Sequence, residues 1–206
     1  MKASQFQPAG NYYDKYQSKN PVEQHLMRRF LQCFDRLATM AAVLDAHEVG
    51  CGEGNLAMRL AERGMSVRGF DISPEVIETA VKNARARGFE IPYRTGSIYE
   101  LQSPSDSASL IVCCEVMEHL EEPDRALSIL ASVARPYLLV SVPREPIWRM
   151  LNLLRGAYIS QAGNTPGHVQ HWSTRAFVKF LREKFEIIKV QKPLPWTMVL
   201  CRVRKN

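Results

Sequence analysis

The chain lacks the sequence features of membrane-spanning proteins, of secreted proteins and of proteins stabilised by disulfides or metal ions. No apolar run approaches the roughly 20 residues that span a bilayer, and no apolar core follows the first residues, so we expect neither a membrane span nor a signal peptide. The five cysteines never form a C-x-x-C pair, so we expect no disulfide framework and no metal site. These absences predict a cytoplasmic protein with reduced thiols.

Repeats and low-complexity tracts are also missing. At 206 residues, with 46% hydrophobic and 23% charged residues, the chain is long enough to bury a complete core and is typical of one soluble domain. Its net charge of +6 suits an anionic partner, or reflects lysines and arginines that are simply solvated. Basic and aromatic residues do not alternate as they do on nucleic-acid surfaces, so we expect no nucleic-acid partner.

The most informative stretch is a glycine-rich turn between an apolar segment and a helix. Residues 41–44 and Val49 predict a short buried strand, and three glycines at alternate positions follow it. Because glycine has no Cβ, such a turn lets backbone N–H groups approach a ligand. A second predicted strand, 66–70, ends on Asp71, at the offset where a carboxylate binds a ribose in doubly wound folds. The pattern predicts a nucleoside site.

The spacing of the glycines separates two kinds of nucleoside ligand. Dinucleotide-binding turns read G-x-G-x-x-G, whereas this turn reads Gly50-x-Gly52-x-Gly54, with Asn55 where the dinucleotide form has its last glycine. Glu48 stands two residues before the first glycine, where a carboxylate repels a pyrophosphate but suits a ligand with an ammonium and a sulfonium group. A nucleotide-dependent oxidoreductase is therefore the disfavoured rival.

These motifs resemble those of the class I S-adenosylmethionine-dependent methyltransferases, whose first motif is an acidic residue followed by G-x-G-x-G. After a predicted fourth strand, 109–114, the chain reads Glu-Val-Met-Glu-His. This is similar to the "EVLEH" segment of the branch that includes ubiquinone-pathway O-methyltransferases and many small-molecule methyltransferases. The resemblance covers about Leu44 to Val203. It implies an α/β fold with a Rossmann-like, doubly wound, seven-stranded sheet, mostly parallel with an antiparallel closing strand.

The same resemblance divides a single methyltransferase domain, 1–206, into four segments. They are an N-terminal lid and helix (1–40), a cofactor-binding half (41–142), a substrate-recognition insertion (143–172), and a C-terminal helix with the closing strands (173–206). The remaining predicted helices cover 22–40, 74–87, 123–134, 147–158 and 173–184, and the remaining strands cover 137–142, 185–190 and 198–203.

The resemblance also implies a set of contacts to S-adenosyl-L-methionine. The residues are Tyr13, Tyr16, Glu48, Gly50, Cys51, Gly52, Asp71, Ile72, Ser97, Ile98, Cys114 and Glu115. Tyr13 and Tyr16 belong either to a lid over the cofactor or to a frayed tail, and Ile72 lies either beside the adenine or in the core. Many family members carry aspartate where this chain has Ser97, whose bond to the adenine amine is weaker and uncharged.

Candidate catalytic residues follow from the chemistry of methyl transfer. The protein aligns acceptor, methyl group and sulfur, and a base helps where the acceptor is a hydroxyl. His119 is the first candidate, because it follows the fourth strand at the edge where ligands bind; a structural role at a helix start is the alternative. His168 and His171, in a loop dense in hydrogen-bonding groups, are further candidates.

The acceptor is predicted from the insertion and from missing motifs. The candidate substrate contacts are Arg144, Trp148, Tyr158 and Trp172. The fourth strand is followed neither by the Pro-Pro-aromatic run of nucleobase amino-methyltransferases nor by a Pro-Cys nucleophile. We therefore expect O-methylation of a small molecule, a lipid precursor or a modified peptide. The alternatives are N-methylation and a cofactor-binding but catalytically silent partner protein.

The predicted helix 147–158 leaves a further alternative open. It is broadly apolar with a thin stripe of Arg149, Asn152 and Arg155. Such a helix covers the substrate as a lid, which is the favoured interpretation, or rests on a membrane surface with its arginines near the head groups. The sequence does not indicate an oligomeric state.

Overall fold

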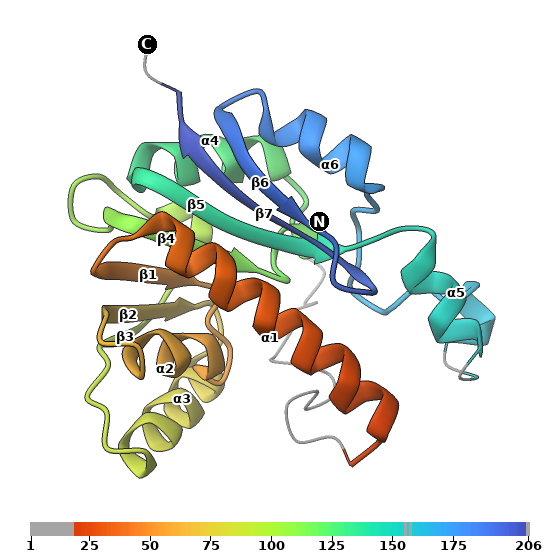
Figure 1. Ribbon diagram of the computed structural model, residues 1–206, viewed down its shortest axis with the longest axis horizontal. Coiled ribbons are helices and arrows are strands. Elements are labelled where there is room, and N and C mark those ends of the chain that lie inside the picture. Colours follow the sequence, from red (N-terminus) through yellow and green to blue (C-terminus); the bar gives the residue numbers. More distant parts are fainter. Residues whose placement is uncertain (1–18, 155, 157, 205–206) are drawn as a thin grey trace, which may run out of the picture.

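The structure, a computed structural model, describes residues 19–154, 156 and 158–204 (Figure 1). The helices are α1 (Pro21–Ala41), α2 (Asn55–Ala61), α3 (Pro74–Ala86), α4 (Pro123–Val133), α5 (Ile147–Leu154) and α6 (Thr174–Leu181). The strands are β1 (Asp45–Val49), β2 (Ser66–Asp71), β3 (Tyr93–Thr95), β4 (Ala108–Cys114), β5 (Ala134–Pro143), β6 (Phe185–Gln191) and β7 (Trp196–Val203). Among the described helices, none combines the length and the apolar character needed to cross a bilayer.

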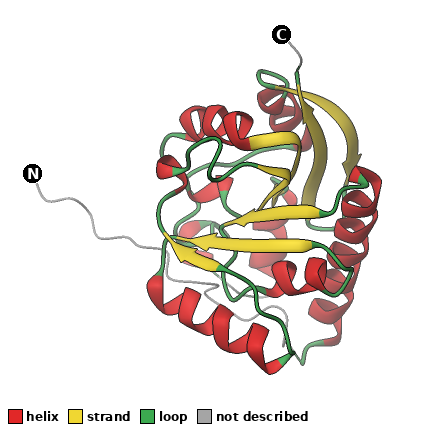
Figure 2. Ribbon diagram, turned by 90° about the vertical axis from the view of Figure 1, so that its left-hand side faces the viewer, coloured by secondary structure: helices red, strands yellow, loops and turns green. Residues whose placement is uncertain are grey.

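The strands form one seven-stranded sheet in the order β3-β2-β1-β4-β5-β7-β6. β7 runs antiparallel to both of its neighbours, β5 and β6, and the other paired strands are parallel. Figure 2 shows the twisted sheet with helices packed around it. The predicted fold class, including the antiparallel closing strand, is confirmed.

Apolar side chains of the central strands pack against helices on both faces of the sheet. In β4, Leu110 and Val112 join the cluster that contains α1 and α2, whereas Ile111 and Cys113 join the cluster that contains α4 and α6. A strand buried on both faces has to be apolar at every position, as the middle of β4 is. The two clusters make a three-layer arrangement of helices, sheet and helices.

The first predicted strand is wrong in its position. Helix α1 continues through Ala41, and Ala42 ends it in the left-handed conformation, at φ 51°. Leu44, predicted to be buried, is 80% exposed. The actual strand, β1, begins at Asp45 and contains two buried polar residues, His47 and Glu48. The search for apolar runs missed β1 because two of its buried residues are polar.

Helix starts were predictable from capping chemistry. Asn20 Oδ1 accepts a hydrogen bond from Val22 N at 2.9 Å, with Pro21 in the first turn of α1. Ser73 Oγ caps α3 in the same way through Val76 N. Helix ends were less predictable, and α5 stops at Leu154, four residues before the predicted end at Tyr158.

Packing of α1 on the sheet makes a stability prediction. Phe34 is fully buried between α1 and the sheet, so Phe34→Ala should lower the free energy of unfolding by about 3–5 kcal/mol through lost burial and a residual cavity. Urea denaturation followed by circular dichroism measures this. Val22→Ala, on the same helix but 66% exposed, is the control and should change stability by about 0.5 kcal/mol at most. Equal losses in the two variants would contradict the packing.

Candidate functional site

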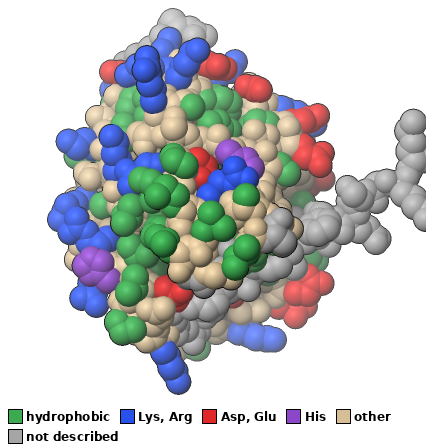
Figure 3. Space-filling model, turned by 90° about the vertical axis from the view of Figure 1, so that its right-hand side faces the viewer, with side chains coloured by type: hydrophobic (Ala, Val, Ile, Leu, Met, Phe, Trp, Pro, Cys, Tyr) green, Lys and Arg blue, Asp and Glu red, His purple; other side chains and the backbone are tan. Residues whose placement is uncertain are grey.

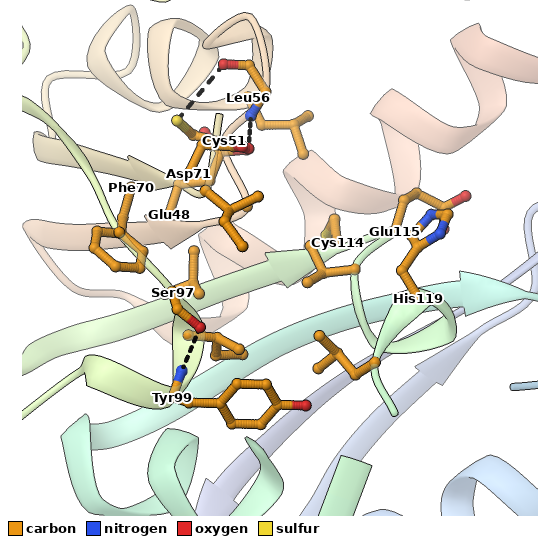
Figure 4. Close-up of a pocket in the computed structure, with 18 of the residues that line it drawn as sticks. Glu48, Cys51, Leu56, Phe70, Asp71, Ser97, Tyr99, Cys114, Glu115 and His119 are labelled. Carbon is orange, nitrogen blue, oxygen red and sulfur yellow. Dashed lines mark hydrogen bonds between the residues drawn. The ribbon is translucent and has the colours of Figure 1, made fainter. Parts of the chain in front are cut away.

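A cavity of about 540 Å³ opens at the carboxyl ends of β1, β2 and β4 (Figure 4). β1 lies between β2 and β4, so the order in which the strands are added to the sheet reverses its direction at β1. In open α/β sheets ligands bind at this switch in strand order. The volume lies within the range of about 300–1,000 Å³ that small-molecule sites occupy.

The glycine turn forms one wall of the cavity. Gly50 and Cys51 both donate their backbone N–H to Phe70 O, at 2.7 and 2.9 Å, which ties the turn to the end of β2. Gly50 has φ +76°, and a Cβ there would collide with the side chain of Val116. The turn therefore needs glycine both for its backbone conformation and for its close approach to the segment after β4.

Asp71 connects this turn to the start of α3. Its Oδ2 accepts from Gly52 N at 2.8 Å, and its Oδ1 accepts from Ser73 N at 3.1 Å. The carboxylate is only partly buried and lines the cavity. Both oxygens are thus fixed in place beside open space, which is the arrangement that a pair of ribose hydroxyls requires.

Glu48 lies deeper in the same wall and has a different environment. Its side chain is 3% exposed, and its Oε2 has no hydrogen-bond partner among the described residues. Burial raises the pKa of this carboxyl well above its usual range, and the negative charge of Asp71 raises it further. A cationic ligand group in the cavity would favour the ionised form of Glu48.

The adenine side of the predicted site is built from the residue between β2 and α3, Ile72, and from the start of a short 3-10 helix, η1 (Ile98–Glu100). Ile72 is 46% exposed and lines the cavity together with Ser97 and Ile98. The Ser97 hydroxyl accepts from Tyr99 N at 3.3 Å and so caps η1. This capping role was not foreseen from the sequence, because it depends on a 3-10 turn that has no apolar period.

The opposite side of the cavity carries Glu115 and His119, which Figure 4 shows well apart from Asp71 and Cys51. Glu115 has φ +60°, and its carboxylate accepts from Ser141 Oγ at 2.9 Å and from Trp196 Nε1 at 2.5 Å. A left-handed conformation is costly for a residue with a side chain, and these two bonds help to maintain it. Cys114, also predicted, lines the cavity beside Glu115.

His119 ends a second 3-10 helix, η2 (Met117–His119), and its Nδ1 lies 3.0 Å from Gly167 O. It is the only one of the three candidate catalytic histidines on the wall of this cavity. His168 is 8% exposed and packs behind it, with ring centroids 4.9 Å apart. His171 is exposed and pairs with Asn164 Oδ1 at 2.7 Å. The structure therefore separates His171 from the cavity.

The four candidate substrate contacts are not on the described wall of the cavity. Trp148 donates to Thr165 Oγ1, and Trp172 packs against Phe177. Arg144 pairs with Trp172 through the backbone, and Tyr158 precedes a 3-10 turn in a left-handed conformation. The insertion thus uses the side chains of Trp148 and Trp172 in contacts within the protein. A sequence pattern shows that residues can bind a ligand but not which way they face.

Several residues on the cavity wall were not predicted, and Tyr13 and Tyr16 lie outside the described residues. The unpredicted ones that line it include Phe30, Leu56, Tyr99, Val116, Leu120 and Arg125. Tyr99 had a usable signal, since it is two residues from the predicted Ser97. Phe30 had none, because its α1 reaches the cavity only through the tertiary fold.

Comparison with known proteins agrees with this arrangement. A family model described as a methyltransferase domain matches residues 46–137. The ubiquinone biosynthesis O-methyltransferase of Methylococcus capsulatus is 28% identical over 164 residues, which cover 72% of this chain and 67% of that protein. The Coxiella burnetii enzyme of the same name is 33% identical over 89 residues, 43% of this chain and 38% of its own length. The chain thus spans only part of these relatives.

Solved structures share the fold. The magnesium protoporphyrin IX methyltransferase of Synechocystis with bound S-adenosylhomocysteine has a TM-score of 0.69 and 23% identity, covering 91% of this chain and 89% of that one. The [4+2]-cyclase SpnF has a TM-score of 0.64 and 18% identity, covering 85% and 83%. The family-model match, the curated relatives and the shared fold together support a class I S-adenosylmethionine-dependent methyltransferase. The curated relatives named above are described as O-methyltransferases of ubiquinone biosynthesis.

Burial of Glu48 makes a prediction about pH. Below its ordinary pKa of 4.5, both the folded and the unfolded chain hold the proton on Glu48. Above it, only the unfolded chain releases that proton, so this residue lowers the free energy of unfolding by up to about 1.4 kcal/mol per pH unit until the folded pKa is reached. Urea unfolding of the wild type and of Glu48→Gln, from about pH 4.5 to 7.5, should therefore show the wild type losing stability relative to the variant. A difference that stays constant across this pH range would refute the raised pKa.

Proposed function

We propose that this protein transfers a methyl group from S-adenosylmethionine to a hydroxyl oxygen of a small-molecule or lipid-like acceptor. The observation that carries the proposal is one cavity with two chemically distinct sides. Glycine-turn amides and two carboxylates line one side, and His119 lines the other. The names of the curated relatives support an oxygen acceptor, and a hydroxylated precursor of the ubiquinone type is the first acceptor to test.

The first side suits the donor at each of its polar groups. Asp71 presents a carboxylate already oriented by two backbone N–H groups, for the ribose hydroxyls. Glu48 presents a buried oxygen without a partner among the described residues, for a cationic group of the methionine moiety. Bound S-adenosylmethionine supplies a methyl group activated by its sulfonium, so that the acceptor oxygen forms its bond to carbon as the carbon–sulfur bond breaks and the acceptor releases a proton.

The second side deals with the acceptor. Val116 and Leu120 border the cavity next to His119 and provide apolar surface that excludes water. His119 is the described titratable side chain there whose ring is oriented by a contact to the backbone, through Gly167 O. We propose that His119 acts on the acceptor hydroxyl and promotes loss of its proton. Positioning of donor and acceptor supplies the rest of the rate enhancement.

A catalytically silent binding protein is the second candidate function. The fold alone does not determine the reaction, since the structural neighbour SpnF is described as a [4+2]-cyclase. N-methylation also uses the same donor side. Both alternatives predict donor binding. They differ from the first proposal in whether any acceptor is methylated and in whether the methyl group goes to nitrogen or to oxygen.

Asp71→Ala is the direct test of the donor side. Loss of charge-assisted hydrogen bonds worth about 1.5–3 kcal/mol should weaken binding of S-adenosylhomocysteine at least about tenfold in calorimetry. Methyl transfer from labelled donor to hydroxylated quinone precursors should fall in parallel. Glu62→Gln, a carboxylate paired with Arg87 on the surface, is the matched control and should bind like the wild type.

The outcomes separate the candidate functions. No binding of donor or product by the wild type would refute the proposed function altogether. Binding without label transfer to any acceptor in a cell extract would favour the silent partner. Transfer to an amine in place of a hydroxyl would favour N-methylation.

The outer face of the insertion suggests a contact with lipid. Three apolar side chains of α5 are exposed, Met150 at 56%, Leu153 at 43% and Leu154 at 81%, and Ile159 beyond it is 67% exposed. Figure 3 shows apolar side chains gathered on this side of the molecule, with lysines and arginines near them. No residue of α5 lines the described cavity, which favours a surface contact over a lid. We propose that this face rests on anionic lipid.

Vesicle flotation tests this contact. The wild type should float with anionic vesicles, and Leu154→Glu should reduce the floating fraction, because it places a charge in the apolar face. Leu44→Glu is the matched control, since Leu44 is 80% exposed but lies beside β1, away from α5. Wild-type protein that stays at the bottom of the gradient would rule out the membrane contact and return α5 to the predicted role of a lid.

A further inference from the structure

Tyr93 of β3 lies in one row with Glu48, the buried carboxyl on the donor side of the cavity. Glu48 of β1 is the register partner of Gly69 in β2, and Gly69 is in turn the register partner of Tyr93. Side chains that are level with one another on neighbouring parallel strands point to the same face of the sheet. Glu48 and Tyr93 therefore share one face, with a glycine between them.

Gly69 leaves the space that the ring of Tyr93 occupies. A Cβ at Gly69 would collide with this ring, and since Gly69 does not have a positive φ, its need for glycine is purely steric. Neighbouring strands lie about 4.8 Å apart, so β1 and β3 are separated by about twice that distance. Because no side chain stands on β2 between them, the ring of Tyr93 extends across this gap toward β1.

The hydroxyl of Tyr93 ends beneath the glycine turn, at the start of α2. A Cβ at Gly54, the residue before α2, would collide with this hydroxyl oxygen. The carboxyl of Glu48 is directed to the same end of α2, because it accepts a hydrogen bond from the backbone N–H of Ala57 in the first turn. The two glycines, Gly54 and Gly69, together allow the hydroxyl to approach the region of the carboxyl.

The two groups are chemically complementary. Tyr93 Oη and Glu48 Oε2 are each buried without a hydrogen-bond partner among the described residues. A phenol can donate one proton, whereas an ionised carboxylate only accepts. Because an unpaired buried polar group is destabilising, a hydrogen bond from Tyr93 to an ionised Glu48 would satisfy both groups at once.

The charge of Glu48 determines when this bond is made. Burial raises the pKa of Glu48 well above its usual range, and burial also raises the pKa of the Tyr93 hydroxyl, so both groups favour the protonated form in the free chain. A cationic group of the donor favours the ionised form of Glu48, whose proton then leaves to solvent. The carboxylate then needs a hydrogen-bond donor, which the hydroxyl of Tyr93 can supply.

The described titratable groups around Glu48 differ in what they can donate. Asp71, which Figure 4 shows on the same wall of the cavity, is negatively charged and disfavours the ionised form of Glu48. Three thiols that interact with Glu48 are weak hydrogen-bond donors: Cys51, Cys113 and Cys114. Among these groups, Tyr93 carries the hydroxyl that can compensate the carboxylate.

We propose that Tyr93 is a positioning residue for the methyl donor. Its hydroxyl donates to the carboxylate of Glu48 when the cationic group of S-adenosylmethionine is bound, and this bond holds the carboxylate toward that group. The inference rests on the proposed function, because it takes Glu48 as the partner of the donor's cationic group. Tyr93 is not on the described wall of the cavity, so it acts through Glu48.

A double-mutant cycle tests this coupling by calorimetry with S-adenosylhomocysteine, which retains the ammonium group of the donor. Tyr93→Phe keeps the ring and removes only the hydroxyl, and it should weaken binding about tenfold, as expected for a lost hydrogen bond to a charged acceptor. In the Glu48→Gln background, the same change should weaken binding less than about twofold, because no carboxylate is left to compensate. Tyr137→Phe removes the hydroxyl of a half-buried tyrosine on β5, outside the cavity wall, and is the matched control that should bind like the wild type.

The outcomes distinguish this inference from the proposed function. If Tyr93→Phe binds like the wild type, or loses equal affinity with and without the Glu48 carboxylate, the positioning role is wrong while donor binding still stands. A wild-type chain that does not bind S-adenosylhomocysteine would refute both. A loss that disappears in the Glu48→Gln background would support the positioning role, because a tyrosine that only packs against the glycines would lose the same affinity in both backgrounds.

Discussion

The carboxylate of Asp71 is the interaction on which the donor half of the site depends. It accepts one hydrogen bond from Gly52 in the turn after β1 and one from Ser73 at the start of α3. These bonds hold together two connections that belong to neighbouring parallel strands, and they fix the carboxylate at the edge of the cavity. Without them, the glycine turn would be less constrained and the carboxylate that we propose for the ribose would have no fixed direction. The same group therefore shapes the site and lines the cavity where we propose that the donor binds.

Local chemistry explains what was predictable in the fold. β4 is apolar at the positions that face both helix layers, and α3 begins with a serine cap followed by proline, so both were found from the sequence. β1 was displaced because His47 and Glu48 are buried for reasons that lie elsewhere in the chain. His47 Nδ1 lies 2.8 Å from the backbone oxygen of Asp106, and Glu48 faces the cavity. A polar residue whose partner is distant in sequence looks like a surface residue until the chain is folded.

The candidate site shows the same difference between features set by neighbouring residues and features set by residues distant in sequence. The donor side is made by short motifs at the ends of β1, β2 and β4, where a few consecutive residues determine both conformation and chemistry. All of the predicted donor contacts within the described residues accordingly lie on the cavity wall. The acceptor side depends on the insertion, whose side chains contact η2, α6 and one another across 10 to 50 residues. No periodicity in the sequence specifies which of its polar residues point inward, so Trp148 and Trp172 were assigned to the substrate although they support loops.

Glu115 connects the cavity to the neighbouring strands β5 and β7. It follows β4 directly in a left-handed conformation, and its carboxylate accepts hydrogen bonds from Ser141 of β5 and Trp196 of β7. Trp196 in turn packs against Phe30 of α1 at 5.0 Å and against Trp148 of α5 at 5.9 Å. The start of the antiparallel closing strand thus connects the sheet edge to both the N-terminal helix and the insertion. The N-terminal helix and the insertion are therefore both linked to Glu115 through Trp196, without a contact that involves the glycine turn.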